Sequence, residues 1–365
     1  MADIETTART RRHSRWGLFL PFILLVLIAA GWSAFWFVAR ERTTAALDQW
    51  VAREAEHGRR WTCPARTVGG FPFRFELTCD NPSFSGTTAQ GPVEGSLKRF
   101  LAVAQVYRPN HVIAEAEGPL VVRAVGDGRS LELNWRSLDA SIILPGGRLE
   151  RASLVIEAPA LRATLAADND ALVSFASRLE AHLRRDPARP EGDKAYDVAV
   201  SLNQAVVPPL DDFLGSSEAA DLDARAVVTQ AEAFGVRPRA EELEAWRLAG
   251  GRLELSSVTL VKGATRIEAR GTLGLDEQHR PSGQVDAAVA GLDGLLARFG
   301  IKVRGDLSGL ITGGLERLAG RQPAPLAGDG AVKAGPKLTS LPPVRIDNGR
   351  ITVGPFPVGR VGPLY

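Results

Sequence analysis

The sequence has little of what most catalytic and metal sites are built from. It contains two cysteines, five histidines and one methionine in 365 residues. The histidines stand at positions 13, 57, 111, 182 and 279, and none lies within helix or strand spacing of another histidine or a cysteine. A zinc site needs such clusters, so we expect no metal. The G-x-S-x-G, P-loop and G-x-G-x-x-G motifs are also missing, so we expect no cofactor and no enzymatic activity.

Paired carboxylates are the remaining candidates for chemistry. They occur at Asp211-Asp212, Glu241-Glu242 and Asp276-Glu277, each in a polar turn or at the start of a helix. We interpret them as solvated loop residues. A glycosidase-like pair that meets only in space would leave no signal in the sequence, and this alternative stays open.

The chain has no excess of charge outside its first residues. It holds 44 basic and 42 acidic side chains, and the first 15 residues contain four arginines with Asp3 and Glu5. The rest is therefore neutral, with 40 residues of each sign. A nucleic-acid-binding surface needs a basic patch, so we expect no nucleic acid partner.

One long apolar run is present, from Gly17 to Ala39, and its 23 residues include no charge. A helix rises about 1.5 Å per residue and therefore spans the ~30 Å core of a bilayer over this length. Trp16, Trp32 and Trp36 lie near its ends, where the headgroup region favours them. We predict a transmembrane helix over 16–39. The alternative is a cleaved signal peptide, whose apolar region is usually shorter and ends in a small-residue cleavage site.

The flanking charges predict the orientation of this helix. Four arginines precede it, whereas Arg40 and Arg42 follow it with Glu41 between them. Basic residues favour the cytoplasmic side, so residues 1–15 are predicted to be a cytoplasmic tail and the bulk of the chain to lie across the membrane. Residues 40–60 continue with helical spacing and are predicted to form a helical stalk. Its apolar positions are Ala45, Leu47, Trp50, Val51 and Ala55.

Cys63 and Cys79 are both beyond the predicted anchor. An even number of cysteines in an oxidising compartment predicts one disulfide. Two buried free thiols are the alternative.

From Trp61 onward the period of the apolar residues becomes two. Between Phe71 and Cys79 every odd position is apolar or cysteine, which predicts a strand, and Pro72 favours an edge position because it cannot donate to a ladder. The same alternation recurs at 131–135, 161–165, 196–206, 267–275 and 285–289. We therefore predict an α+β fold that is mostly antiparallel, with a large twisted or curved sheet and a few packing helices.

Helical spacing and turn residues complete the outline. We predict helices at 171–185, within 235–250, at 292–299 and at 307–318. Asn348-Gly349 predicts a type I′ hairpin turn.

The run GGRLE at 146–150 recurs at 250–254, which indicates two β-rich units at 61–215 and 216–319, unless the match is a coincidence. A Gly/Pro-rich linker follows at 320–343, and a terminal hairpin and tail at 344–365.

Two motifs carry a resemblance to a known family. They are Gly70-Phe71-Pro72-Phe73-Arg74-Phe75 between the cysteines, and Leu341-Pro342-Pro343, Asp347-Asn348-Gly349-Arg350 and Gly354-Pro355-Phe356-Pro357 near the end. The chain resembles the family called domain of unknown function 2125, seen mainly in alphaproteobacteria. The resemblance implies a single-pass protein of the bacterial inner membrane with a β-rich periplasmic body, and no activity. A looser similarity to AsmA-like envelope proteins implies lipid handling in an apolar groove of a curved sheet; it rests on Arg270 to Asp276 followed by Ser282-Gly283.

These features favour a lipid- or acyl-chain-binding or transfer protein, with a phospholipid or fatty acid as ligand. A non-enzymatic scaffold of an envelope complex is the alternative, with its terminal hairpin as the docking edge, and an envelope hydrolase is a third. The predicted groove-lining residues are Phe71, Phe73, Phe75, Ile267, Leu273, Leu275, Val285 and Val289. The sequence names no protein partner.

Overall fold

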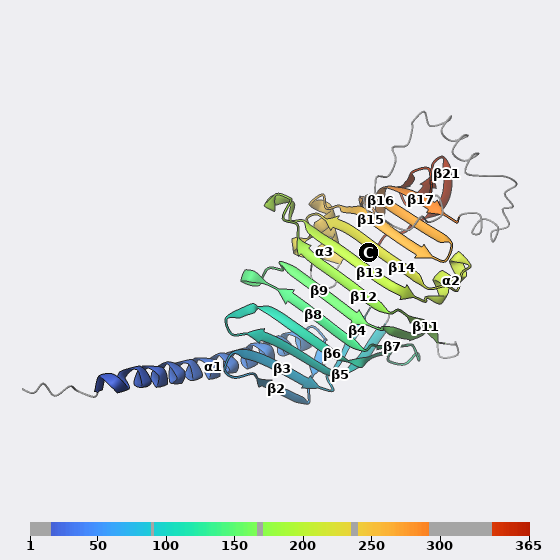
Figure 1. Ribbon diagram of the computed structural model, residues 1–365. Coiled ribbons are helices and arrows are strands. Elements are labelled where there is room, and N and C mark those ends of the chain that lie inside the picture. Colours follow the sequence, from blue (N-terminus) through green and yellow to red (C-terminus); the bar gives the residue numbers. More distant parts are fainter. Residues whose placement is uncertain (1–15, 89–90, 166–170, 235–239, 292–337) are drawn as a thin grey trace, which may run out of the picture.

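The computed structural model describes residues 16–88, 91–165, 171–234, 240–291 and 338–365. In this part of the chain one large antiparallel β-sheet extends from a long N-terminal helix (Figure 1). The helices are α1 (Trp16–Glu56), α2 (Pro208–Leu214) and α3 (Ala240–Leu248). The predicted fold class, mostly antiparallel β with an N-terminal apolar helix and a curved open sheet, is confirmed.

The sheet has 21 strands. Their bounds are β1 (Arg60–Thr62), β2 (Ala65–Gly69), β3 (Arg74–Asp80), β4 (Ser83–Thr88), β5 (Gly91–Gln105), β6 (Arg108–Ala124), β7 (Ser130–Asn134), β8 (Ser137–Ile143), β9 (Arg151–Glu157), β10 (Ala160–Thr164), β11 (Leu172–Phe175), β12 (Arg178–Arg185), β13 (Tyr196–Ala205), β14 (Ala220–Val228), β15 (Leu253–Lys262), β16 (Thr265–Leu275), β17 (Pro281–Ala290), β18 (Thr339–Ser340), β19 (Val344–Asp347), β20 (Arg350–Val353) and β21 (Phe356–Arg360).

Helix α1 joins the predicted membrane segment and the predicted stalk in one continuous helix of 41 residues. Among the described residues it is the one helix long and apolar enough to cross a membrane, and its most apolar stretch of 18 residues has a mean hydropathy of 2.3. Its large apolar side chains between Phe19 and Phe35 are exposed, as expected of a lipid-facing surface. The helix ends at Glu56, four residues before the predicted end of the stalk, because the chain turns there into β1.

The main body of the sheet runs from β2 at one edge to β21 at the other. Neighbouring strands pair in the order β2-β3-β5-β6-β8-β9-β12-β13-β14-β15-β16-β17-β19-β20-β21. Strands β5 and β6 are 15 and 17 residues long. The parts of these strands that do not pair with β3 or β8 carry a branch of the sheet. In this branch β4 and β1 extend from β5, while β7, β10 and β11 extend from β6.

The pairing of β13 with β14 crosses the boundary predicted at residue 215. Strands of both predicted units therefore belong to one sheet.

The register places apolar residues on one face of the main body from β3 to β17. Directly paired residues lie on the same face of an antiparallel sheet. The central row across this face is Leu77, Ala102, Ala114, Ala140, Leu154, Ala181, Val200, Ala224, Val258, Ala269 and Ala287. The paired residues Glu115 and Asp139 belong to the opposite face and are exposed. The sheet is thus apolar on one side and polar on the other.

The predicted helix at 171–185 is wrong. Residues 172–175 form β11 and residues 178–185 form β12, which pairs with β9 and β13. The four-residue spacing of Phe175, Leu179 and Leu183 also fits a period of two, and strand partners on both sides favour the extended form.

The predicted edge position of the strand after Phe71 is also wrong. Phe71, Pro72 and Phe73 form a turn, and β3 begins at Arg74 with β2 on one side and β5 on the other. Pro72 precedes the ladder, so its missing N–H costs no pairing.

Other predictions are confirmed. Asn348 and Gly349 have positive φ angles of 50° and 71° and connect β19 to β20, as a type I′ turn requires. Helix α3 lies within 235–250. The helices predicted at 292–299 and 307–318, and most of the predicted linker at 320–343, lie outside the described residues.

Cys63 and Cys79 form the predicted disulfide, which closes a loop across β2 and β3. Their sequence separation is 16. Closing a loop of this length restricts the unfolded chain, so replacing both cysteines by serine should lower the free energy of unfolding by about 3 kcal/mol. Urea unfolding of the two proteins measures this difference. Equal midpoints with equal slopes would contradict it.

Tyr365 is held against α3 by a small polar cluster. Its hydroxyl donates to Glu244 Oε2 at 2.9 Å, and its ring stacks on His279 with centroids 4.4 Å apart. Arg247 donates to the same carboxylate at 2.7 Å. The hydrogen bond from Arg247, followed by that from Tyr365, lowers the pKa of Glu244 from 4.5 to about 2.

This pKa predicts how the cluster depends on pH. Because the folded-state pKa of Glu244 is lowered, its stabilising contribution is present above pH 4.5 and is lost as the pH falls towards 2. Replacing Tyr365 by phenylalanine removes one donor and should raise the Glu244 pKa towards 4.5. A ¹³C-carboxyl NMR titration measures it. An unchanged pKa in Tyr365→Phe would mean that the hydroxyl does not stabilise the carboxylate.

Candidate functional site

An apolar groove lies between α1 and the first strands of the sheet. Its volume is about 310 Å³, and all but one of its lining residues are apolar. The lining consists of Thr43, Ala46, Leu47, Trp50, Val68, Phe75, Leu77, Ala102, Val103, Ala104 and Val112. Helix α1 therefore forms one wall, and strands β2, β3, β5 and β6 form the other.

Two indole groups fix α1 against the sheet beside this groove. Trp36 is 3% exposed, stacks on Phe75 with ring centroids 5.8 Å apart, and donates from Nε1 to the Arg74 carbonyl oxygen at 3.1 Å. Trp32 donates from Nε1 to the Pro72 carbonyl oxygen at 2.9 Å. One turn further along, Arg40 Nε donates to the Val68 carbonyl oxygen at 2.8 Å. These bonds hold the end of the apolar part of α1 against the turn between β2 and β3.

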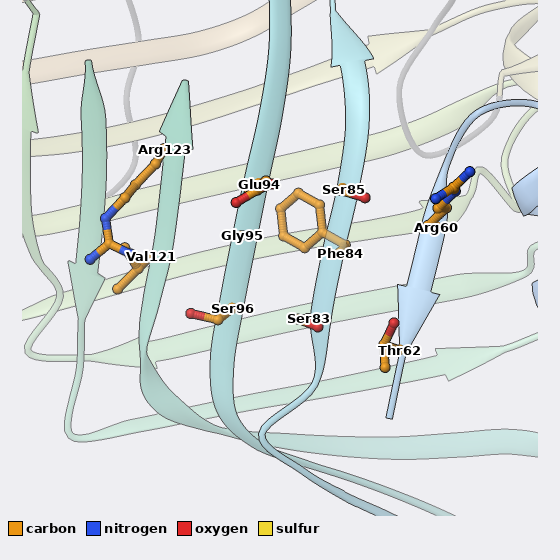
Figure 2. Close-up of a pocket in the computed structure, with 10 residues that line it drawn as sticks. All are labelled: Arg60, Thr62, Ser83, Phe84, Ser85, Glu94, Gly95, Ser96, Val121 and Arg123. Atoms are coloured by element: carbon orange, nitrogen blue, oxygen red, sulfur yellow. The ribbon is translucent and has the colours of Figure 1, made fainter. Parts of the chain in front are cut away.

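A chain of aromatic rings extends from α1 to the branch of the sheet. Trp50 lies 5.9 Å from Trp61 on β1, and Trp61 lies 5.3 Å from Phe84 on β4. The Phe84 ring covers Gly95 of β5, where an added Cβ would come within 2.3 Å of the ring (Figure 2). Glycine is therefore required at this position for the ring to pack.

The groove opens onto the apolar face of the sheet. Its sheet wall includes Leu77 and Ala102, the first two residues of the central row. Every residue of that row keeps part of its surface exposed. Contiguous exposed apolar surface is a feature of interaction sites in soluble domains.

The structure distributes the predicted groove residues over three places. Phe75 lines the groove, whereas Phe71 and Phe73 are exposed in the turn before β3. The others lie on β16 and β17 at the far end of the sheet, on the same face as Phe75 according to the register: Ile267, Leu273, Leu275, Val285 and Val289. Their role in ligand binding stays a prediction.

Sequence reasoning missed the part of the site contributed by α1. Thr43, Ala46, Leu47 and Trp50 face the sheet, although the chain separates them from β5 by about 50 residues. The signal was the helical spacing of apolar residues in the predicted stalk, because a helix surrounded only by water has no need of an apolar stripe.

A second, polar pocket lies on the branch of the sheet, with a volume of about 360 Å³. Figure 2 shows Arg123 of β6 and Arg60 of β1 on either side of Glu94 and three serines. The serines are Ser83, Ser85 and Ser96. The lining combines two arginines, one carboxylate and three serine hydroxyls, so it offers both hydrogen-bond donors and acceptors.

Within the described ranges, no group of three or more His, Cys, Asp or Glu side chains is placed to hold a metal ion. The carboxylate pairs differ from the predicted solvated loops at two residues, since the Asp276 side chain is 16% exposed and pairs with Arg280 at 2.8 Å. Asp211 lies in α2 and pairs with the fully buried Lys262 at 2.6 Å, so its role is in packing.

Residues 36–362 match the model of a protein family described as an uncharacterized protein conserved in bacteria, DUF2125. The chain belongs to this family. The match begins at Trp36 and therefore covers the groove, the whole described sheet and the terminal hairpin. No curated protein and no solved structure matches the chain. The similarity to AsmA-like proteins is not shown by these comparisons.

Proposed function

We propose that this protein is a non-enzymatic lipid-binding or lipid-transfer protein, anchored in the bacterial inner membrane by α1 with its sheet in the periplasm. The observation that carries the proposal is the apolar groove between α1 and the sheet. Acyl chains are the ligands that such a lining favours, because burial of their methylene groups contributes about 0.8 kcal/mol each.

The position of the groove supports a lipid that enters from the membrane. Trp32 and Trp36 belong at the membrane–water interface. The groove residues Thr43 and Trp50 follow Trp36 by 7 and 14 positions on the same helix, and therefore lie about 10 to 21 Å further from the bilayer at a rise of about 1.5 Å per residue. In this proposal an acyl chain that leaves the bilayer along α1 travels about 10 Å before it reaches the groove.

Charge and redox chemistry support the proposed orientation and compartment. More arginines precede the apolar segment than follow it, which favours a periplasmic sheet. The disulfide between Cys63 and Cys79 fits an oxidising compartment.

Filling the groove should remove the lipid. We expect Ala104→Trp, which places an indole in the lining, to lower the amount of bound lipid at least ten-fold, a loss of about 1.4 kcal/mol in binding free energy. The full chain is extracted from bacterial membranes, washed with detergent and analysed by mass spectrometry for retained phospholipid and fatty acid. Wild-type protein should retain lipid in stoichiometric amount.

The matched control is Ala199→Trp, at a partly exposed alanine of β13 on the opposite face. This variant should retain as much lipid as wild type. Wild-type protein that folds but retains no lipid would overturn the proposal. Equal loss in both variants would mean that the groove is not the binding site.

The scaffold alternative would use the edge of the sheet for docking. Within the described residues β21 pairs with β20 alone and is exposed along its length. However, β21 is short and contains Pro357, and both features discourage edge-to-edge pairing. These features of β21 argue against the scaffold alternative, whereas the apolar groove supports lipid binding.

A further inference from the structure

The turn between β2 and β3 exposes two large aromatic rings. Phe71 is 51% and Phe73 is 63% exposed. Gly70 precedes them with a φ of 96°, and an added Cβ there would lie 2.7 Å from the Arg74 carbonyl oxygen, so the tight turn requires glycine. Turns at a sheet edge are usually polar, and exposed apolar side chains that adjoin one another mark an interaction surface.

The rings lie directly against the end of the apolar segment of α1. Phe71 stacks on Phe37 with centroids 5.8 Å apart, and Phe73 lies 6.3 Å from Trp32. Phe35 and Phe37 of the helix are themselves more than half exposed. The exposed apolar surface of α1 therefore continues without interruption onto the turn.

We propose that Phe71 and Phe73 insert into the headgroup and acyl boundary of the bilayer leaflet at this end of α1, as a second membrane contact beside the anchor. This inference rests on the proposed function, in which α1 spans the membrane. The occupant is the lipid surface because the two rings lie at the level of Trp32 and Phe37 along the helix. A membrane-spanning helix has lipid against its exposed sides at that level, so exposed rings that pack beside it lie next to lipid.

The residues around the turn are of the types found at the boundary between headgroups and acyl chains. Trp32 and Trp36, which hold the turn through hydrogen bonds, are of the type that concentrates at the interface. The Arg74 side chain is 58% exposed and follows Phe73 directly, and Arg40 follows Trp36 by one turn. Arginines in this position reach the phosphate level while their neighbours stay in the apolar region.

Insertion has a consequence for the groove. Phe75 follows Phe73 by two residues and lines the groove, so the turn and the groove share β3. A turn fixed in the leaflet therefore keeps the sheet wall of the groove beside the membrane. This contact adds to the anchoring of the sheet by α1. Lipid then enters a groove whose two walls both end in the bilayer.

The test uses photo-crosslinking of the full chain in bacterial membranes. A benzophenone amino acid replaces Phe73 in one protein and Phe213 in another. Phe213 is 58% exposed and lies on α2, at the ends of strands β13 and β14 and away from α1 (Figure 1). After irradiation, mass spectrometry of the peptides should show lipid adducts at position 73, at least ten-fold more than at position 213.

A third probe at Leu27, in the middle of the apolar segment, separates the two possible failures. Adducts at position 27 without adducts at position 73 would overturn the inference and leave the anchor intact. No adducts at position 27 or 73 would overturn both the anchor and the inference. Equal yields at positions 73 and 213 would show that contact with lipid is not specific to this turn, and would also overturn the inference. A probe at Phe71 repeats the measurement within the same turn.

Discussion

Replacing Asp211 by alanine is expected to lower the free energy of unfolding by about 3 to 5 kcal/mol, because it leaves a buried ammonium group without its partner. Lys262, at the end of β15, is 0% exposed, and its Nζ lies 2.6 Å from Asp211 Oδ1. The same Nζ donates to the Glu218 carbonyl oxygen. The ion pair thus connects α2 to the end of β15.

The size of this effect depends on burial. A carboxylate and an ammonium group in water gain little from pairing, whereas an ammonium group that is removed from water and unpaired costs several kcal/mol. Lys262 cannot regain water without displacing α2 or the loop that contains Glu218. We therefore expect Asp211→Ala to loosen the packing of α2 against the end of β15 as well as to destabilise the chain.

Two control variants isolate the buried charge. The double variant Asp211→Ala/Lys262→Met removes both charges and keeps an unbranched side chain at position 262, so it should be more stable than Asp211→Ala. Asp223→Ala breaks the exposed ion pair with Arg225 and should change the stability by less than about 0.5 kcal/mol. Urea unfolding of the four proteins measures these values. A loss in the double variant as large as that in Asp211→Ala would mean that packing, rather than the unpaired charge, sets the cost.

The sequence predicted neither partner of this pair. Asp211 stands next to Asp212 after two prolines, a pattern typical of solvated loops, and Lys262 is an isolated lysine after an alternating strand. Only the pairing of β14 with β15 brings the two together, since 51 residues separate them. Side chains that meet through strand order leave no local signal.

Strands with one polar face were predictable for a different reason. The alternation of apolar and polar residues along a strand indicates which of its faces is buried. The runs at 131–135, 196–206 and 267–275 were therefore assigned correctly as strands. The run at 172–185 was not, because its apolar residues fit both periods and the turn at Ala176 and Ser177 carries no glycine or proline. The pairing of β12 with β9 and β13 decided its structure.

The apolar groove was predictable only in part. Alternation in 71–79 indicated that Phe75 and Leu77 belong to an apolar face, and the stalk pattern indicated that α1 has an apolar stripe. That these two surfaces face each other depends on the hydrogen bonds from Trp32, Trp36 and Arg40 to backbone carbonyl oxygens. A carbonyl oxygen is present at every residue, so the sequence does not show which ones accept.

The proposed function makes a further prediction about the middle of the sheet. Replacing Val200 on β13 by glutamate is expected to stop lipid from moving beyond the groove, because its carboxylate would have to lose water beneath an acyl chain. Val200 lies in the central row between Ala181 and Ala224. A benzophenone probe at Val258, two strands further along the row, detects lipid that has passed this point. We expect its lipid adducts to fall at least ten-fold in the variant.

Two further measurements are needed to interpret a fall in the lipid adducts at Val258. A probe at Leu47 in the groove should form as many lipid adducts in Val200→Glu as in wild type, since the groove is left unchanged. The control Ala199→Glu puts the same charge on the neighbouring residue of β13, which faces the other side, and should change neither yield. Adducts at Leu47 but none at Val258 in the wild-type chain would confine the lipid to the groove. The apolar row would then hold a partner of another kind, and the protein would bind lipid without carrying it along the sheet.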